Sequence, residues 1–250
     1  MDNVGRCAAI AVVAITTILA PATAQAQMVG DSTSPLALVA LLAGMALLPF
    51  ALIMVTSFVK VAVVLSILRT AIGAQQVPPN QIITGLAIVL SIYIMAPVGE
   101  DMYVELEPHL QAHEAGELEL TFASLEEITT EVGEPLRQFL LRHADEEDRL
   151  LLHELALEMR DEDQRERIGE EDFLILVPAF VVTELKRAFT IGFILFVPFI
   201  VIDLVVANIL LSLGMHMLSP TTISLPFKLL LFVLVDGWYL VVQGLILGYV

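Results

Sequence analysis

Two charged residues stand inside the apolar last quarter of the chain, and they limit how that quarter can fold. Lys228 and Asp236 are each flanked by long runs of aliphatic and aromatic residues. An unpaired charge at bilayer depth costs about 2.5–3.5 kcal/mol even on the mildest insertion scales. The rise of a helix separates the two residues by about 12 Å, which is too far for them to pair. Each therefore needs a partner on another segment, with Asp203 and Glu184 as candidates, or on another chain.

The sequence also allows a second interpretation of these two charges. Lys228 can extend its amine from a helix end toward the membrane surface, and Asp236 can cap a helix break before Gly237. The spacing of the residues is compatible with both interpretations.

The composition indicates a membrane protein with one soluble part. The chain is 57% apolar and 16% charged, and its mean hydropathy is +0.83. The acidity is concentrated between residues 100 and 172, which carry 24 acidic and 6 basic residues. No basic cluster exceeds Lys186-Arg187, so nucleic-acid binding is disfavoured.

Residues 1–26 are typical of a secretory signal peptide. Arg6 precedes a short apolar run, and two small-x-small cleavage patterns follow between Ala22 and Ala26. An uncleaved first anchor is the alternative. Cys7 is the only cysteine, so a mature chain without this peptide has no disulfide, thiolate metal site or cysteine nucleophile.

Two apolar runs that follow are long enough to cross a bilayer. Residues 36–59 are 24 uncharged, mostly apolar residues, and residues 82–98 form a second run that an Ala-Pro-Val-Gly sequence should end. We expect the segment 60–81 to be a cytoplasmic turn because it carries Lys60 and Arg69. Its apolar face consists of Val61, Val64, Leu65 and Leu68.

The acidic segment is expected to be a helical insert in the periplasm. An exported N-terminus and two crossings place it there, and leucines at helical spacing predict a helix that begins at Pro135. His109 and His113 beside Glu114 have metal-ligand spacing, but no third His or Cys ligand accompanies them. A solvated helix face is the favoured interpretation of this pair.

A charged interruption divides the apolar segment 173–218. Glu184, Lys186 and Arg187 oppose burial of this segment in lipid as one straight span, and Gly192 and Pro198 are candidate bends. Glycine and proline near residue 214 should return the chain toward the last helix. A helical hairpin results, and its tip carries Met215, His216 and Met217.

The predicted fold is an all-α membrane protein of helical hairpins, with about four hydrophobic spans and an acidic helical periplasmic insert. No Gly-rich phosphate loop, catalytic triad or metal-ligand set occurs in the sequence, so neither enzyme activity nor a cofactor is expected. The predicted divisions are a signal peptide at 1–26, two hydrophobic helices with a basic turn at 27–99, the acidic insert at 100–172, and C-terminal hydrophobic helices with a gate loop at 173–250.

Five blocks of sequence outside the acidic insert carry a specific signature. They are Leu48-Pro49 to Thr56-Ser57-Phe58, Leu68-Arg69-Thr70-Ala71-Ile72-Gly73 with Gln75-Gln76-Val77-Pro78-Pro79-Asn80, Pro178-Ala179-Phe180 to Thr183-Glu184-Leu185-Lys186, Ile191-Gly192-Phe193 to Ile202-Asp203-Leu204, and Leu225-Pro226-Phe227-Lys228 to Val235-Asp236-Gly237-Trp238. In this order they closely resemble the FliP/SctR (YscR/HrcR-type) family, the core export-apparatus proteins of type III secretion systems in injectisomes and flagella.

The resemblance implies a pentamer that joins FliQ/SctS-type and FliR/SctT-type proteins in a helical export channel. It places the protein in the bacterial inner membrane, largely facing the periplasm, within the secretion basal body. In this family a methionine-rich loop closes the channel around unfolded exported proteins, and the matching residues are Met215, His216 and Met217. His216 replaces a common third methionine, so it either faces the pore and makes the seal sensitive to acid, or points into subunit packing.

Smaller sequence features bear on the branch of the family and on the alternative functions. A cleaved signal peptide is more typical of flagellar members, whereas the Gln75-Gln76 turn and the ending 243–249 resemble injectisome members, and we favour the injectisome. Without the resemblance, the alternatives are a multi-span ion or solute transporter with an intramembrane charge relay, and a structural scaffold. The candidates for pairing between helices or subunits are Glu184, Lys186, Asp203, Lys228 and Asp236.

Overall fold

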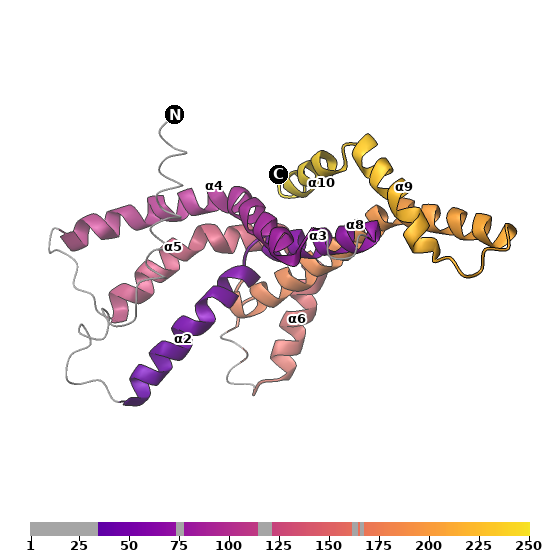
Figure 1. The fold of residues 1–250 in the computed structure, drawn as a ribbon. Coiled ribbons are helices and arrows are strands. Elements are labelled where there is room, and N and C mark those ends of the chain that lie inside the picture. Colours follow the sequence, from indigo (N-terminus) through magenta and orange to yellow (C-terminus); the bar gives the residue numbers. More distant parts are fainter. Residues whose placement is uncertain (1–34, 74–77, 115–121, 162–164, 166–167) are drawn as a thin grey trace. The chain divides into compact units, whose positions relative to one another are not determined.

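The structure is a computed structural model that describes residues 35–73, 78–114, 122–161, 165 and 168–250. This part of the chain is helical, without strands, which confirms the predicted all-α class (Figure 1). The proposed signal peptide, 1–26, lies outside the described residues. The chain divides into two compact units, Met1–Leu52 and Ile53–Val250.

Helix α2 (Pro35–Met54) supplies the described part of the first unit. It is apolar throughout and has no charged residue in its first or last turn. The sequence predicted one apolar run over 36–59, but the helix ends five residues earlier. A short non-helical stretch follows, in which the Ser57 hydroxyl donates a hydrogen bond of 3.1 Å to Ser91.

Helix α3 (Phe58–Ile72) occupies most of the segment expected to be a cytoplasmic turn. The predicted apolar face is confirmed, because its four members are at most 1% exposed. The segment was expected to be a turn, but it is a helix, and Lys60 is 1% exposed on the same helical face as Val64 and Leu68. The helix ends at Gly73, whose φ of 75° is in the left-handed region that glycine adopts easily.

Helices α4 (Asn80–Glu114) and α5 (Phe122–His143) both extend beyond their predicted limits. The expected stop near residue 97 is wrong, since α4 continues through Pro97. The expected helix start at Pro135 is also wrong, since this proline lies inside α5. Packing of α4 against α3 and α5 outweighs the one hydrogen bond that each proline removes.

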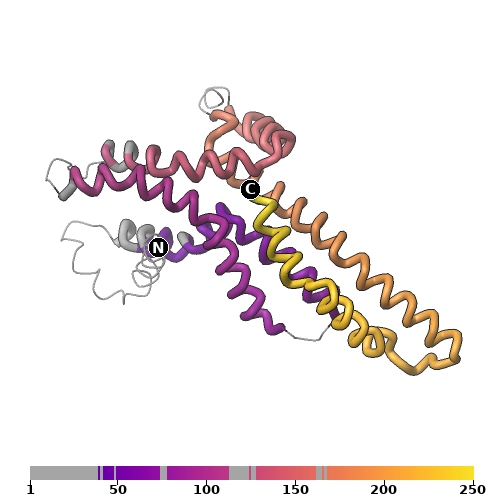
Figure 2. Tube along the Cα trace, turned by 90° about the horizontal axis from the view of Figure 1, so that it is seen from above, coloured from indigo at the N-terminus to yellow at the C-terminus, as the bar shows by residue number. Residues whose placement is uncertain are grey.

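The remaining helices are α6 (Glu146–Glu158), α8 (Phe173–Ser212), α9 (Pro220–Leu234) and α10 (Gly237–Leu247). Helix α8 runs for 40 residues, or about 60 Å, and is not broken at Gly192 or Pro198. Gly192 serves close packing instead, because a Cβ there would lie 2.4 Å from the Ile67 side chain of α3. Helices α8 and α9 form the predicted hairpin (Figures 1 and 2).

Two buried clusters hold the second unit together. The larger one surrounds α3 and includes buried side chains of α4, α8, α9 and α10. The smaller one joins α5 to the first half of α8 through Phe139, Leu140 and Phe180. Helix α8 belongs to both clusters, and its charged residues lie between them, where it meets α3.

Two helices are long and apolar enough to cross a membrane, Asn80–Ala112 and Phe173–Ser212, and the number rises to four if each of two bent helix pairs counts as one span. One of these pairs, Pro220–Leu234 with Gly237–Leu247, is bent by 61°. The described residues thus agree with the predicted membrane protein of hairpins and an acidic helical insert.

Candidate functional site

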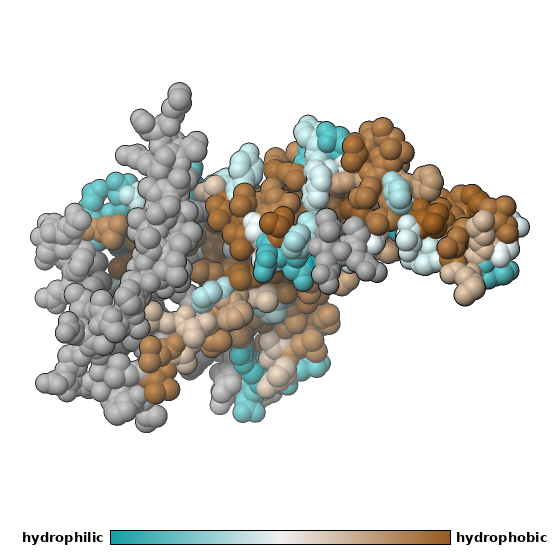
Figure 3. Space-filling view, in the orientation of Figure 1, coloured by the Kyte–Doolittle hydropathy of each residue, from teal (hydrophilic) through white to brown (hydrophobic). Residues whose placement is uncertain are grey.

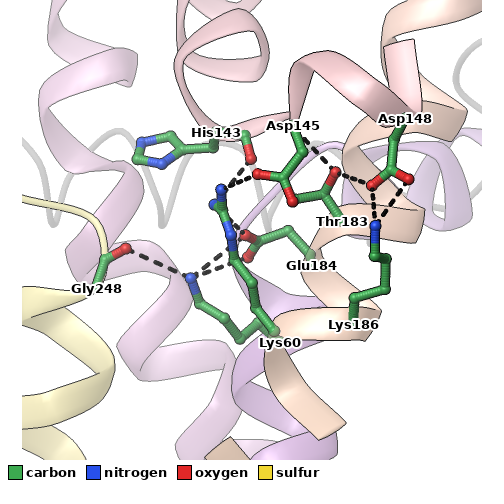
Figure 4. A network of polar contacts seen from close by, with 9 residues as sticks. Lys60, His143, Asp145, Asp148, Thr183, Glu184, Lys186 and Gly248 are labelled. Carbon is green, nitrogen blue, oxygen red and sulfur yellow. Dashed lines mark hydrogen bonds and ion pairs between the residues drawn. The ribbon is translucent and has the colours of Figure 1, made fainter. Parts of the chain in front are cut away.

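The charged interruption of α8 lies where this helix meets α3 and the α5–α6 turn, which here means residues 143–148 and so includes the end of α5 and the first residues of α6 (Figure 4). Glu184 is fully buried and points toward α3, whereas Lys186 and Arg187 contact the turn. One helical turn therefore sends charges to two different neighbours. This division explains how α8 continues as one helix although it carries three charges between residues 184 and 187.

Lys60 and Glu184 form a buried ion pair between α3 and α8. The Lys60 Nζ lies 3.2 Å from Glu184 Oε2, and the two side chains are 2% and 0% exposed. Tyr249 donates a hydrogen bond from its hydroxyl to Glu184, and its ring centroid lies 3.5 Å from Lys60 Nζ. The Gly248 carbonyl, 3.5 Å away, accepts another hydrogen bond from the amine. A buried pair needs such additional partners to offset the loss of hydration.

The α5–α6 turn neutralises the two basic residues of α8. Lys186 Nζ lies 3.0 Å from Asp148, and Arg187 lies 2.5 Å from Asp145. The Thr183 hydroxyl donates to Asp148 at 2.8 Å and accepts from the Asp145 backbone N–H at 3.0 Å (Figure 4). The acidic segment is thereby fixed to the middle of α8.

Two titratable groups of this turn have perturbed pKa values. Burial raises the pKa of Asp148, but hydrogen bonds from Lys186 and Thr183 lower it more, so the net pKa is below the usual value. Burial lowers the pKa of His143 to about 4, and the charges of Lys60 and Arg187 add to this effect. The His143 ring packs against Phe139 and Tyr249, so it is held neutral between aromatic neighbours at neutral pH.

Lys228 and Asp203 form a second ion pair, between α9 and α8. Their Nζ and Oδ2 atoms are 2.7 Å apart. Ser224 donates to the other oxygen of Asp203 at 2.5 Å, and Lys228 also donates to the Ala71 carbonyl at 3.1 Å. Ala71 lies in the last turn of α3, where a cation compensates the helix dipole. Lys228 therefore joins three helices and is 4% exposed.

Asp236 occupies the break between α9 and α10. Its backbone is left-handed, with φ and ψ of 52°, and no side-chain cap bond is present. Its side chain is exposed, and among the described residues it has no ion pair. Gly237 is needed next to it, because a Cβ there would lie 2.2 Å from the Phe232 ring.

The hairpin tip, residues 213–219, carries the predicted gate residues. Gly214 has a φ of 73° and ends α8. Met215 is 46% exposed and Met217 is 100% exposed, and His216 is exposed as well. None of these side chains belongs to a buried cluster of the described chain.

The two histidines with metal-ligand spacing, His109 and His113, were interpreted as part of a solvated helix face. His109 contacts Glu131 of α5 at 2.8 Å, and the side chain of His113 lies outside the described residues. No group of three potential ligands occurs among the residues that the structure describes.

Sequence reasoning missed several residues of the site, and one of them had a detectable signal. Lys60 precedes Val64 and Leu68 at intervals of four residues, so helical spacing placed it on the buried face. Tyr249, Asp145 and Asp148 had no comparable local signal, because their contacts join segments far apart in the chain.

The fold and these contacts define an all-helical membrane protein whose long apolar helices hold charges in buried pairs. The family model described as the FliP family matches residues 41–245. The chain therefore belongs to the FliP family, which confirms the resemblance inferred from its sequence blocks.

Relatives in three bacteria show the breadth of this family. The chain is 47% identical over 212 residues to Yop proteins translocation protein R of Yersinia pestis, covering 85% of this chain and 95% of the relative. It is 40% identical over 212 residues to hypersensitivity response secretion protein HrcR of Ralstonia nicotianae, covering 85% and 96%. It is 41% identical over 214 residues to flagellar biosynthetic protein FliP of Bacillus subtilis, covering 86% and 91%. These relatives and the apolar helices support a component of protein secretion in the inner membrane.

Proposed function

We propose that this protein is a subunit of the type III secretion export gate, and that several copies oligomerise into the channel that admits unfolded exported proteins. The observation that carries the proposal is the apolar surface that α8 and α9 leave uncovered in the single chain. Phe193, Leu204 and Leu230 are 68%, 58% and 60% exposed. Apolar residues cover broad areas of this hairpin (Figure 3). An exposed apolar surface of this extent requires lipid or protein neighbours.

Protein neighbours are favoured over lipid by the charges on the same helices. Asp203 remains 31% exposed although it is paired, and Asp236 is exposed without an ion pair in the described chain. Hydrocarbon solvates such groups poorly, whereas an adjacent subunit can supply hydrogen bonds and opposite charge. Glu184, Lys186, Asp203, Lys228 and Asp236 are accordingly proposed to fix the contacts between helices or subunits.

The tip of the α8–α9 hairpin is the proposed channel gate. Met215 and Met217 are flexible, polarizable and exposed, which suits a seal that closes on itself and tolerates varied passing side chains. His216 between them would make this seal wetter and sensitive to acid if it faces the pore. A proton-leak assay of His216→Met should then lose a pH dependence that the unmodified protein shows.

The proposed setting follows the injectisome branch. The partners are FliQ/SctS-type and FliR/SctT-type proteins together with unfolded exported proteins, and the segment 100–172 faces the periplasm. The chain acts by oligomerisation and constriction, without catalysis or a cofactor. A transporter relay is not favoured, because the charges of α8 and α9 are used in separate local pairs.

The gate is tested by ion leakage through the assembled complex. Met215→Ser with Met217→Ser should increase leakage of ions in cells that express the chain with its neighbouring export genes. Met159→Ser is the matched control, since Met159 is 86% exposed but lies at the end of α6. Unchanged leakage in the double variant would favour a structural scaffold over a gate.

A further inference from the structure

The apolar helices contain two opposite charges that have no ion pair among the described residues. Helices α3, α8, α9 and α10 with their connections carry five basic and three acidic residues. Glu184 and Asp203 are paired within these helices, and Lys186 and Arg187 are paired with the α5–α6 turn. Within the described residues, one cation and one anion are left over, and these are Arg69 and Asp236.

Each of the two charges has surroundings that oppose leaving it unpaired. Asp236 is exposed and follows Val233 and Leu234, which are 76% and 73% exposed. Arg69 is half-buried, and its described side-chain contact is a hydrogen bond donated to Asn80, which has no charge. A guanidinium has five N–H donors, and this hydrogen bond uses one of them. Hydrocarbon would destabilise both charged groups, whereas an opposite charge beside each would stabilise them.

Arg69 and Asp236 lie within the same stretch of the molecule along α3. Lys228 contacts Ala71, and Gly248 contacts Lys60, so the chain from 228 to 248 runs antiparallel to α3. Asp236 lies between these two contacts along the chain, and Arg69 lies between Lys60 and Ala71 in α3. The helical distance from Lys60 to Ala71 is about 16 Å. A neighbouring copy related by rotation, with or without a shift along α3, can therefore bring its Asp236 to this Arg69.

A shallow groove beside Arg69 provides room for the neighbouring side chains. It has a volume of about 400 Å³ and is lined by Ala62, Ser66 and Ile67 of α3 and by Phe189 and Phe196 of α8, among others. Arg69 follows Ser66 by three residues and Ala62 by seven, which places it at the edge of the groove face. Its lining is predominantly apolar, as are the residues that precede Asp236.

We propose that the α9–α10 break of one copy docks on the α3–α8 groove of a second copy, with Asp236 of the first paired to Arg69 of the second. This inference rests on the proposed homo-oligomer and specifies its contact. The contact uses two different patches, so it is heterologous, and its repetition generates a ring or, with a shift along the axis, a helical array. The left-handed Asp236 and the buried Gly237 hold the carboxylate outward for this pairing.

Disulfide cross-linking between two differently tagged copies tests the pairing. In a Cys7→Ser background, one copy carries Arg69→Cys and the other Asp236→Cys, and both are coexpressed with the neighbouring export genes. Mild oxidation should yield a cross-linked dimer that contains both tags. The matched control pairs Arg69→Cys with Leu213→Cys, because Leu213 is 63% exposed but lies ten residues, about 15 Å, beyond Asp203 along α8. This control should give at least tenfold less cross-linked product.

Charge exchange separates this inference from the proposed function. Arg69→Asp and Asp236→Arg alone should each reduce recovered oligomer at least tenfold, and their combination should restore most of it. An intact oligomer that neither cross-links at these positions nor responds to charge exchange overturns the contact and leaves the export-gate proposal standing. An unmodified chain that purifies only as a monomer overturns both. Circular dichroism of each single variant confirms that the helices still form.

Discussion

Breaking the buried Lys60–Glu184 pair should destabilise the protein strongly, and unequally from its two sides. Removing one member of a buried ion pair typically costs about 3–5 kcal/mol, because the other charge stays buried without its partner. After Lys60→Met, Glu184 retains Arg187 at 3.4 Å and the Tyr249 hydroxyl, so the loss should lie near 3 kcal/mol. After Glu184→Leu, Lys60 retains only an aromatic ring and a carbonyl, both 3.5 Å away, so the loss should approach 5 kcal/mol.

Thermal unfolding in detergent measures this asymmetry. A chain of this size loses about 2–4 °C of midpoint per kcal/mol, so we expect decreases of about 6–12 °C for Lys60→Met and 10–20 °C for Glu184→Leu. Trp238 is the only tryptophan and packs edge-on against Phe232 at 5.4 Å, so its fluorescence reports the unfolding of the core. The double variant removes both charges and should be more stable than either single variant. Two losses below about 1 kcal/mol that add in the double variant would refute the buried pair.

Three further predictions concern the α5–α6 turn and the last helix. His143 has a pKa of about 4 in the folded protein against an ordinary value of 6.5, so protonation favours the unfolded state. Stability should therefore fall as the pH decreases from 6.5 to about 4. His143→Phe should remove most of this pH dependence from unfolding midpoints measured at several pH values. Asp148→Asn should release Lys186 and increase proteolysis of the acidic segment at neutral pH, whereas in the unmodified protein this contact should persist until pH falls below the ordinary carboxyl range. Gly237→Ala should lower the unfolding midpoint, because its Cβ would meet the Phe232 ring, at a cost of about 1–3 kcal/mol.

Controls make these predictions specific. Gly244→Ala lies in the same helix with no atom within 4 Å of the added Cβ, so it should leave the midpoint unchanged or raise it. Equal effects of the two glycine substitutions would contradict the packing at Gly237. An unchanged pH slope in His143→Phe would assign the acid sensitivity to another group.

The hydrophobic pattern predicted the helices well but not their limits. Helical spacing identified the buried face of α3, and the glycine and proline near residue 214 identified the α8–α9 hairpin. Proline was overweighted as a sign of helix ends, since α4 continues through Pro97 and α5 through Pro135. Contacts with distant segments favour the continuation of these helices, and a single sequence does not display such contacts.

The charges required partners on physical grounds, but the partners themselves came from the fold. The sequence predicted that Lys228 needs a carboxylate and offered Asp203 and Glu184 as candidates, and the structure places it 2.7 Å from Asp203. Glu184 lies instead with Lys60, 124 residues away in the chain. The charge of Lys60 indicated a cytoplasmic turn, whereas the residue lies on the buried face of α3. Contacts between segments so far apart depend on the arrangement of helices, which local patterns do not fix.

Native mass spectrometry of the complex tests the central proposal most directly. The chain should be coexpressed with the neighbouring export genes, extracted in mild detergent and weighed intact. We predict a discrete complex that contains several copies of this chain together with smaller membrane proteins. A monomer or an isolated dimer would contradict the export-gate proposal and favour a transporter.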